Sequence, residues 1–342
     1  GGHVTCGGIV YQGGLMPALE GMYVAANPLS NVIHWHKLER NGSTFKASHG
    51  GTLLSTDDPW FRPIDCLTGP DGAIYVADWY DARLNHVDPR DNWDRRNGRI
   101  YRIAPKGFKP SRPEAPPGTM EAWLGHPNSW YRAQERQRLF EGFALSDLDA
   151  LRRLLRRGDR TALEALWALS GPETFDDATA DAGLTHAEPA LRAWSVRLRG
   201  DRRTLTAGQC IRFAELARND PSPQVRTQLA CSAKRLPAEQ ALPILRELLQ
   251  RREDVEDPYL PLLIWWALED KALSARELVL EQLFSGEAWN FPLTRKVLLE
   301  RIGRRYLAEG EYATTAHLLD TAPDAEALTL LLRGMEKALE GR

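Results

Sequence analysis

The segment WFRPIDCLTGPDGAIYVADWY, residues 60–80, decides how the first part of this chain folds. Its centre, Gly-Pro-Asp-Gly at 69–72, is a turn sequence. The proline fixes φ at the first central position, the aspartate can bond its own backbone, and the last glycine tolerates positive φ. The flanks, 64–67 and 73–77, are rich in β-branched and aromatic residues that favour strands. The segment therefore predicts a β-hairpin.

Short apolar runs separated by Gly, Pro and Asn continue this texture as far as about residue 104. Besides the hairpin, the predicted strands are 7–12, 21–26, 32–38 and 98–103. Regularly spaced short strands are typical of an all-β sandwich, barrel or propeller. A hundred residues hold about two propeller blades, whose open edges need partner strands, so we expect further blades before residue 1.

The residue pattern changes after a Pro-rich linker at 105–120, whose stiffness suits a spacer between two folded units. From 121 to 342, Leu, Ala, Arg and Glu recur at helical spacing. Predicted helix starts recur at intervals of about 28 to 37 residues, which indicates a repeat array. The starts are His126-Pro127, Arg160-Thr161, Glu188-Pro189, Asp220-Pro221, Asp257-Pro258 and Phe291-Pro292.

Several of these starts are followed by an arginine on the new helix, namely Arg132, Arg192, Arg226 and Arg295. Short paired helices with this pattern resemble HEAT repeats, in about six units. The predicted fold class is thus multidomain, β then α. Residues 1–104 form the closing blades of a partial β-propeller, 105–120 the linker, and 121–342 a HEAT-like α-solenoid.

The composition of the 342 residues is globular, with 43% hydrophobic residues and a formal charge of −2. This charge balance recruits neither nucleic acid nor an anionic membrane. No apolar run reaches the roughly 18 residues of a membrane span. The basic run Leu151–Arg160 has its leucines on one helical face and its arginines on the other, so a solvated face is favoured over a nucleic-acid site.

The four cysteines, Cys6, Cys66, Cys210 and Cys231, show neither C-x-x-C nor any zinc or haem spacing. Cys6 and Cys66 are predicted to be buried small hydrophobes, although a pair within a sheet is the alternative. The redox state of the four thiols is left open.

Three blocks of the β region, residues 7–24, 31–35 and 60–80, resemble the closing blades of the soluble quinoprotein sugar dehydrogenases. These belong to the glucose/sorbosone dehydrogenase group and form six-bladed propellers. Together with the helical repeats and DPYLPLLIWWALE at 257–269, the chain resembles the large membrane-bound dehydrogenase-type protein of Planctomycetes and Verrucomicrobia. This combination of blocks is more specific than any one of them.

The resemblance implies a sugar or alcohol dehydrogenase that uses pyrroloquinoline quinone, with calcium, in a periplasmic or extracellular location. It also implies a cytochrome c domain or partner as electron acceptor. No haem motif occurs in this chain, so we expect such a domain, if present, beyond residue 342.

The resemblance further places Arg62 at the first of two arginine positions that hold the quinone. Ile64 occupies the second position, and the strand around 29–31 lacks the expected lysine. An anionic tricarboxylate is best held by several fixed cations. The alternative for Arg62 is a structural ion pair with Asp65. His3 is predicted as a second ligand-binding residue at the propeller mouth, with His86 as another candidate there.

Two groups are candidate metal ligands. Asp78, Asp88 and Asp91, with neighbouring aspartates, crowd one loop and offer oxygens to Ca²⁺, although Asp is also a common loop residue. His34 and His36 share one face of a predicted strand, as metal ligands can, although a half-exposed strand gives the same pattern without a metal.

Two functions remain open at this point. One is the quinone-dependent dehydrogenase. The other is a non-catalytic scaffold that binds a protein on its helical surface or a glycan at its propeller, as the extended surface of a solenoid permits.

Overall fold

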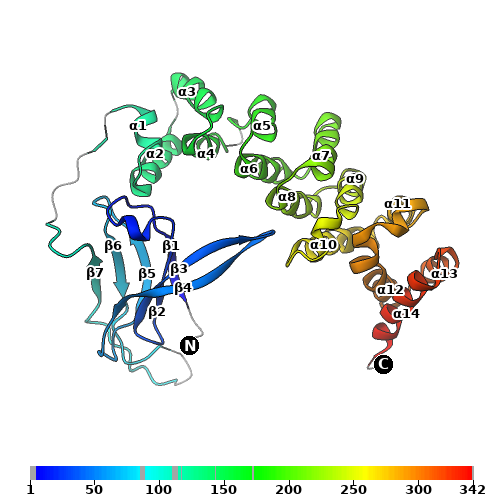
Figure 1. Ribbon diagram of the computed structural model, residues 1–342, viewed down its shortest axis with the longest axis horizontal. Helices are drawn as coiled ribbons and strands as arrows, with labels where there is room; N and C mark the ends of the chain where they lie inside the picture. The colour runs from blue at the N-terminus through cyan, green and yellow to red at the C-terminus, as the bar shows by residue number, and fades with distance from the viewer. Residues whose placement is uncertain are drawn as a thin grey trace. The chain divides into compact units, whose positions relative to one another are not determined.

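The computed structural model describes residues 5–84, 89–109, 115–116, 118–142, 144–171 and 173–340, without the side chain of residue 145. Strands come first and helices follow, so the predicted β-then-α class is confirmed (Figure 1). The chain forms two compact units. The first comprises Gly1–Glu39 and Phe45–Gly171, and the second Arg40–Thr44 and Pro172–Arg342.

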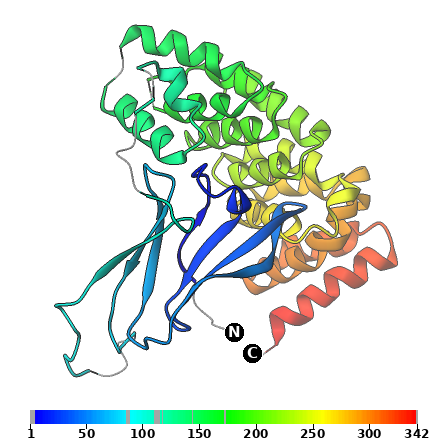
Figure 2. The same ribbon diagram turned by 60° about the vertical axis from the view of Figure 1, so that its left-hand side comes forward.

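The strands form two antiparallel sheets, ordered β1-β2-β3-β4 and β5-β6-β7. Their bounds are β1 (Cys6–Val10), β2 (Tyr23–Asn27), β3 (Val32–Asn41), β4 (Thr44–Ser55), β5 (Pro63–Thr68), β6 (Ile74–Asp78) and β7 (Arg99–Ile103). Every strand predicted from the sequence is present. The prediction missed β4, which pairs with β3 in the long blue hairpin of Figure 2.

The β5–β6 hairpin turns as its sequence predicts. The N–H of Gly72 donates to the carbonyl of Gly69 over 3.0 Å, and the N–H of Ala73 donates to Oδ1 of Asp71 over 3.0 Å. Gly72 takes φ of 80°, which suits glycine. Burial works to raise the pKa of Asp71, but the hydrogen bonds from Ala73, Arg102 and Tyr75 outweigh it and lower the pKa. The turn is therefore held by an ionised carboxylate.

The two sheets share one core, to which both contribute fully buried side chains. These include Tyr11, Val24 and Ile33 from the β1–β4 part, and Phe61, Cys66, Ile74 and Val76 from the β5–β7 part. Their close approach requires glycine at position 7, where a Cβ would come within 2.3 Å of the Cα of Asp65. The hydroxyl of Tyr11 donates to the carbonyl of Gly72 over 2.6 Å. The first sheet thereby supports the turn of the second.

The same turn contacts the first long helix, α2 (Ser129–Glu141). Asn128 caps this helix by accepting the N–H of Trp130, and its Nδ2 donates to the carbonyls of Gly69 over 2.9 Å and Pro70 over 3.2 Å. The N–H of Ser129 donates to the carbonyl of Gln12 over 2.7 Å. The polar backbone of the turn is thus satisfied by the helix that follows in sequence.

From Met120 onward, the described elements of the chain are helices and short helical turns. The other bounds are α1 (Met120–Leu124), α3 (Leu145–Leu155), α4 (Arg160–Ala168), α5 (Asp177–Leu184), α6 (Pro189–Gly200), α7 (Ala207–Asn219), α8 (Pro223–Ala233), α9 (Ala238–Leu249), α10 (Leu260–Ala272), α11 (Arg276–Leu283), α12 (Leu299–Ala308), α13 (Tyr312–Thr321) and α14 (Ala325–Leu339). Short turns of 3₁₀ or π helix lie at η1 (Pro17–Leu19), η2 (Arg252–Asp254), η3 (Gly286–Asn290) and η4 (Thr294–Leu298). The predicted starts fall within a few residues of the observed ones, and Pro189 is the first residue of α6.

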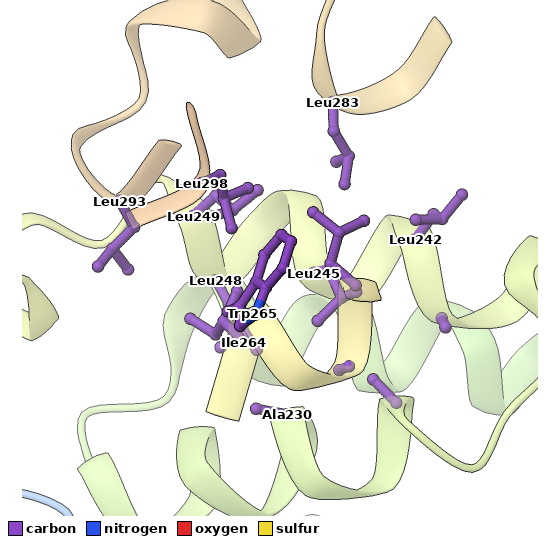
Figure 3. Close-up of a cluster of buried hydrophobic side chains, with 14 of the residues drawn as sticks. Ala230, Leu242, Leu245, Leu248, Leu249, Ile264, Trp265, Leu283, Leu293 and Leu298 are labelled. Carbon is purple, nitrogen blue, oxygen red and sulfur yellow. The ribbon is translucent and has the colours of Figure 1, made fainter. Parts of the chain in front are cut away.

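Within the second unit, alternate helices pack on one another: α6 on α8 and α8 on α10 in one layer, α7 on α9 and α9 on α11 in the other. Leucines from neighbouring pairs meet between the layers around Trp265 (Figure 3). Trp265 is buried in this core, whereas its neighbour Trp266 is 46% exposed. In α12 and α14, Gly303 and Gly334 allow close approach, since a Cβ at Gly334 would overlap the carbonyl of Glu300.

The arginines predicted on the new helices all pair with an acid 28 to 32 residues further on. The pairs are Arg132–Glu164, Arg192–Asp220, Arg226–Asp254 and Arg295–Asp324. The most buried is Arg226–Asp254, where Nε and Nη2 donate to the two carboxylate oxygens over 2.6 and 2.5 Å. Each such arginine ties one helical pair to the next, which explains why it recurs.

The four cysteines are free thiols. Cys66 is buried as predicted, whereas Cys6 is only half-buried, so the prediction is wrong for Cys6. Burial together with the nearby Asp65 carboxylate raises the pKa of Cys66 to about 12. The leucines of the basic run, Leu151, Leu154 and Leu155, are buried as expected. None of the helices in the described part of the chain has the length and hydropathy that crossing a membrane demands.

Candidate functional site

The loop that joins β6 to β7 is organised by two buried aspartates. Asp78 ends β6, and its Oδ1 accepts the N–H groups of Arg62 over 2.7 Å and Tyr80 over 2.9 Å. Tyr80 takes φ of 47°, a conformation that this hydrogen bond helps to fix. Asp81 accepts the N–H of Arg83 on Oδ1 and the N–H of Asp94 on Oδ2 over 2.7 Å. The two ends of the loop are therefore tied together at Asp81.

The guanidinium of Arg62 donates hydrogen bonds to main-chain carbonyls of this loop and of the segment that follows β2. Nε donates to Asp81 over 3.0 Å, Nη1 to Pro28 over 2.9 Å, and Nη2 to Ala82 over 3.2 Å. Asp65, the alternative partner expected from the sequence, accepts the N–H of Cys66 instead. Arg62 thus joins the end of β2, the start of β5 and the β6–β7 loop.

The predicted calcium ligands have different surroundings. Oδ2 of Asp78 is buried without a hydrogen-bond partner, while Asp91 forms an exposed ion pair with Arg95 at 2.8 Å. Asp88 and His3 lie outside the described residues, as does His86. Across the described ranges no group of three or more His, Cys, Asp or Glu side chains is arranged to hold a metal ion. The calcium site stays a prediction.

Beside this framework the loop forms a cavity of about 620 Å³. Its lining consists of Trp79, Trp93, Asp94, Arg95, Asn97 and Gly98. The two indole rings stand almost perpendicular, at 87°, with centroids 6.2 Å apart. Trp79 is 50% exposed, and Arg83 stacks at 4.3 Å from the centroid of Trp93, which fixes that ring. The cavity therefore presents the exposed ring of Trp79 beside the ring of Trp93, which Arg83 holds in place.

The polar side of the cavity is built by Asp94. Its Oδ1 accepts the N–H groups of Arg96 over 2.8 Å and Asn97 over 3.1 Å, and its Oδ2 accepts Nδ2 of Asn97 over 3.1 Å. The hydrogen bond from the N–H of Arg96 has the largest effect, and together with the bonds from Asn97 it lowers the pKa of Asp94. The Asp94 carboxylate is therefore ionised at neutral pH. Arg95 and Asn97 also line this cavity.

Aromatic faces next to planar polar groups suit one class of small ligand. The C–H face of a pyranose packs on an indole ring, while its hydroxyls bond carboxylate, amide and guanidinium groups in pairs. A volume of this size lies within the usual range for small-molecule sites. In size and in chemistry the cavity is compatible with a sugar residue.

Residues 3–107 match the family model of a domain of unknown function (DUF7133). The match covers the β region, including Arg62 and the cavity residues, and less than a third of the chain. No curated protein and no solved structure matches the chain.

Sequence reasoning named Arg62 and the aspartates of this loop but missed the cavity. Trp79 and Trp93 are separated by a loop whose closure depends on Asp81, so their proximity cannot be inferred from spacing. The available signal was Trp93 itself, a large aromatic in an otherwise polar loop. Such a residue has little reason to be there unless it packs on a partner or a ligand.

Proposed function

We propose that this chain is a binding protein whose β region holds a glycan in the Trp79–Trp93 cavity and whose helical array serves as a scaffold. The observation that carries the proposal is the cavity itself: a half-exposed indole opposite a rigid polar rim. Nothing in this arrangement requires catalysis. It corresponds to the non-catalytic function that the sequence left open.

At the level of fold, we propose that the two sheets are blades of a β-propeller and the helices a HEAT-like solenoid. Each sheet has neighbouring strands in sequence order, as in propeller blades. The arginine–acid pairs that follow four of the six predicted helix starts support a repeat architecture. A protein partner on the surface of the helical array is part of this proposal.

The surroundings of Arg62 favour binding over the quinone-dependent dehydrogenase expected from the resemblance. Pyrroloquinoline quinone carries three carboxylates and is best held by cations with free donors. Three of the five N–H groups of the Arg62 guanidinium donate to carbonyls, and Ile64 supplies no charge. This chain's residues therefore fit the quinone poorly. The cytochrome c partner and the periplasmic or extracellular location stay predictions.

Native affinity electrophoresis tests the glycan proposal. The purified chain is run through gels that contain soluble β-glucan, xylan, mannan or alginate, and retardation by at least one of them is expected. Trp79→Ala abolishes the retardation, because it removes the accessible aromatic face. Trp266→Ala is the matched control: this tryptophan is similarly exposed, at 46% against 50%, but lies on α10.

Two results would overturn the proposal. One is mobility unchanged by every polysaccharide. The other is retardation that survives Trp79→Ala, which would place binding elsewhere on the protein. The quinone-dependent dehydrogenase function is tested by a dye-linked dehydrogenase assay with added quinone and calcium. Sugar-dependent turnover that is abolished by Arg62→Met would establish that function.

A further inference from the structure

Three imidazole rings gather on the β3–β4 hairpin, away from the cavity. The ring centroids of His34 and His49 are 4.9 Å apart, those of His36 and His49 5.6 Å, and those of His34 and His36 6.3 Å. The sequence singled out the first two residues, and His49 on β4 completes the set. All three lie within the first compact unit.

The strand geometry explains why these rings meet. His34 and His36 are two residues apart on β3, so they share one face, and Trp35 between them points to the other face. Trp35 packs against the core shared by the two sheets. Gly50 lies on that same inner face, since a Cβ there would come within 2.2 Å of the Trp35 ring. Its neighbour His49 therefore points outward, beside the other two histidines.

The spacing of the rings is close to that of metal-bound imidazoles for one pair and wider for the other two. In a tetrahedral zinc site, with Zn–N bonds of about 2.0–2.1 Å, the centroids of two ligating imidazoles lie about 5 Å apart. The His34–His49 distance lies at this value, the His36–His49 distance is somewhat longer, and the His34–His36 distance is the longest of the three. The rings pack edge to face, and among the described residues no group of three or more His, Cys, Asp or Glu side chains is arranged to hold a metal ion as it stands. Binding of a metal by these three rings therefore requires their side chains to move.

The local chemistry favours ligation. A ligating imidazole has to be neutral and held in a fixed orientation. Oγ1 of Thr52 lies 3.2 Å from Nδ1 of His34. A partner at one ring nitrogen orients the other toward a metal. An all-imidazole set suits zinc and its neighbours among the transition metals better than calcium or magnesium.

We propose that His34, His36 and His49 form a binding site for a divalent transition-metal ion of the zinc type. The three strand positions supply the protein ligands, and the exposure of His49 leaves the outer side of the site open to water or to a further ligand. The proposal is independent of the glycan cavity, which shares no residue with it.

Isothermal titration of the untagged, EDTA-dialysed chain with Zn²⁺ tests the site. One equivalent is expected to bind, and His49→Ala is expected to weaken binding at least about tenfold, because one of three ligands is lost. His317→Ala, which removes a histidine on α13, leaves the affinity unchanged. Far-UV circular dichroism of each variant verifies that the fold is retained.

Two further readouts separate this site from other histidines. Co²⁺ in place of Zn²⁺ should give the intense visible absorption of a low-coordinate nitrogen site, and His36→Ala should remove it. Imidazole ¹⁵N resonances of His34, His36 and His49 should shift together during the Zn²⁺ titration. Absence of saturable binding, or binding that His49→Ala and His36→Ala leave intact, would overturn the proposal.

Discussion

Removal of one member of the Arg226–Asp254 pair should be among the most destabilising changes in the helical array. Both side chains are 3% exposed, and two charge-assisted hydrogen bonds join them. Arg226→Met leaves the Asp254 carboxylate buried without its partner. Breaking a buried pair in this way costs about 3–5 kcal/mol, and two hydrogen bonds to charged groups give a similar figure, about 3–6 kcal/mol.

The matched control is Arg218→Met. Arg218 forms the same two-bond arrangement with Glu247, at 2.8 and 2.7 Å, but its side chain is 65% exposed. Solvent screening limits such a pair to about 0–1 kcal/mol. The double variant Arg226→Met/Asp254→Leu removes both buried charges, so it should recover most of the loss.

The assay is urea unfolding followed by far-UV circular dichroism, with hydrogen exchange of α8 and α10. Exchange is needed because repeat arrays can unfold in parts, so one transition does not report on every repeat. Arg226→Met should accelerate exchange in the helices that flank the pair more than Arg218→Met does. If the free energies of unfolding of the two single variants differ by less than about 1 kcal/mol, burial does not set the strength of these pairs.

Gly334→Ala should destabilise the protein by about 1–3 kcal/mol, because its Cβ has no room between α12 and α14, whereas Gly208→Ala, with nothing within 4 Å, should be neutral or stabilising in thermal melts. The hydrogen bonds from Arg295, and then from the main chain, lower the pKa of Asp324 to about 2, from an ordinary 3.8. The resulting stabilisation is complete above pH 4 and is lost as the pH falls toward 2; ¹³C carboxyl titration of Arg295→Ala should show the pKa returning upward, and an unchanged value would contradict the assignment. Arg62→Met should loosen the β6–β7 loop, seen as faster hydrogen exchange there, while an unchanged exchange rate would show that its three carbonyl contacts are dispensable.

Much of the local structure could be predicted because it depends on neighbours in sequence. The Gly-Pro-Asp-Gly turn specifies its own hydrogen bonds, so the β5–β6 hairpin was found. The arginine that follows several of the helix starts was visible as a pattern. Its acidic partner was not, since the pairing depends on how successive helical pairs stack.

The missing strand β4 shows where local reasoning fails. Gly50 and Gly51 interrupt its alternation and favour a loop, yet Gly50 is required because the Trp35 ring covers it. Asn41-Gly42 was the available signal for a hairpin at that point. Missing β4 also meant missing His49, so the three-histidine cluster could not be predicted.

Only part of the candidate site could be predicted, because its contacts join residues that lie far apart in the sequence. Arg62 was singled out as a quinone ligand, or alternatively as an ion-pair partner of Asp65, but its partners in the structure are carbonyls as far away as Pro28. Main-chain acceptors leave no trace in the sequence. The indole pair likewise depends on the closure of a loop by Asp81.

Binding of a glycan at Trp79 and Trp93 is tested most directly by titrating the ¹⁵N-labelled chain with oligosaccharides from the polysaccharide that retards it. The indole N–H resonances of Trp79 and Trp93 are expected to shift with one saturation curve, while that of Trp266 stays in place. Indole resonances of Trp79 and Trp93 that remain unchanged at saturating oligosaccharide would contradict it.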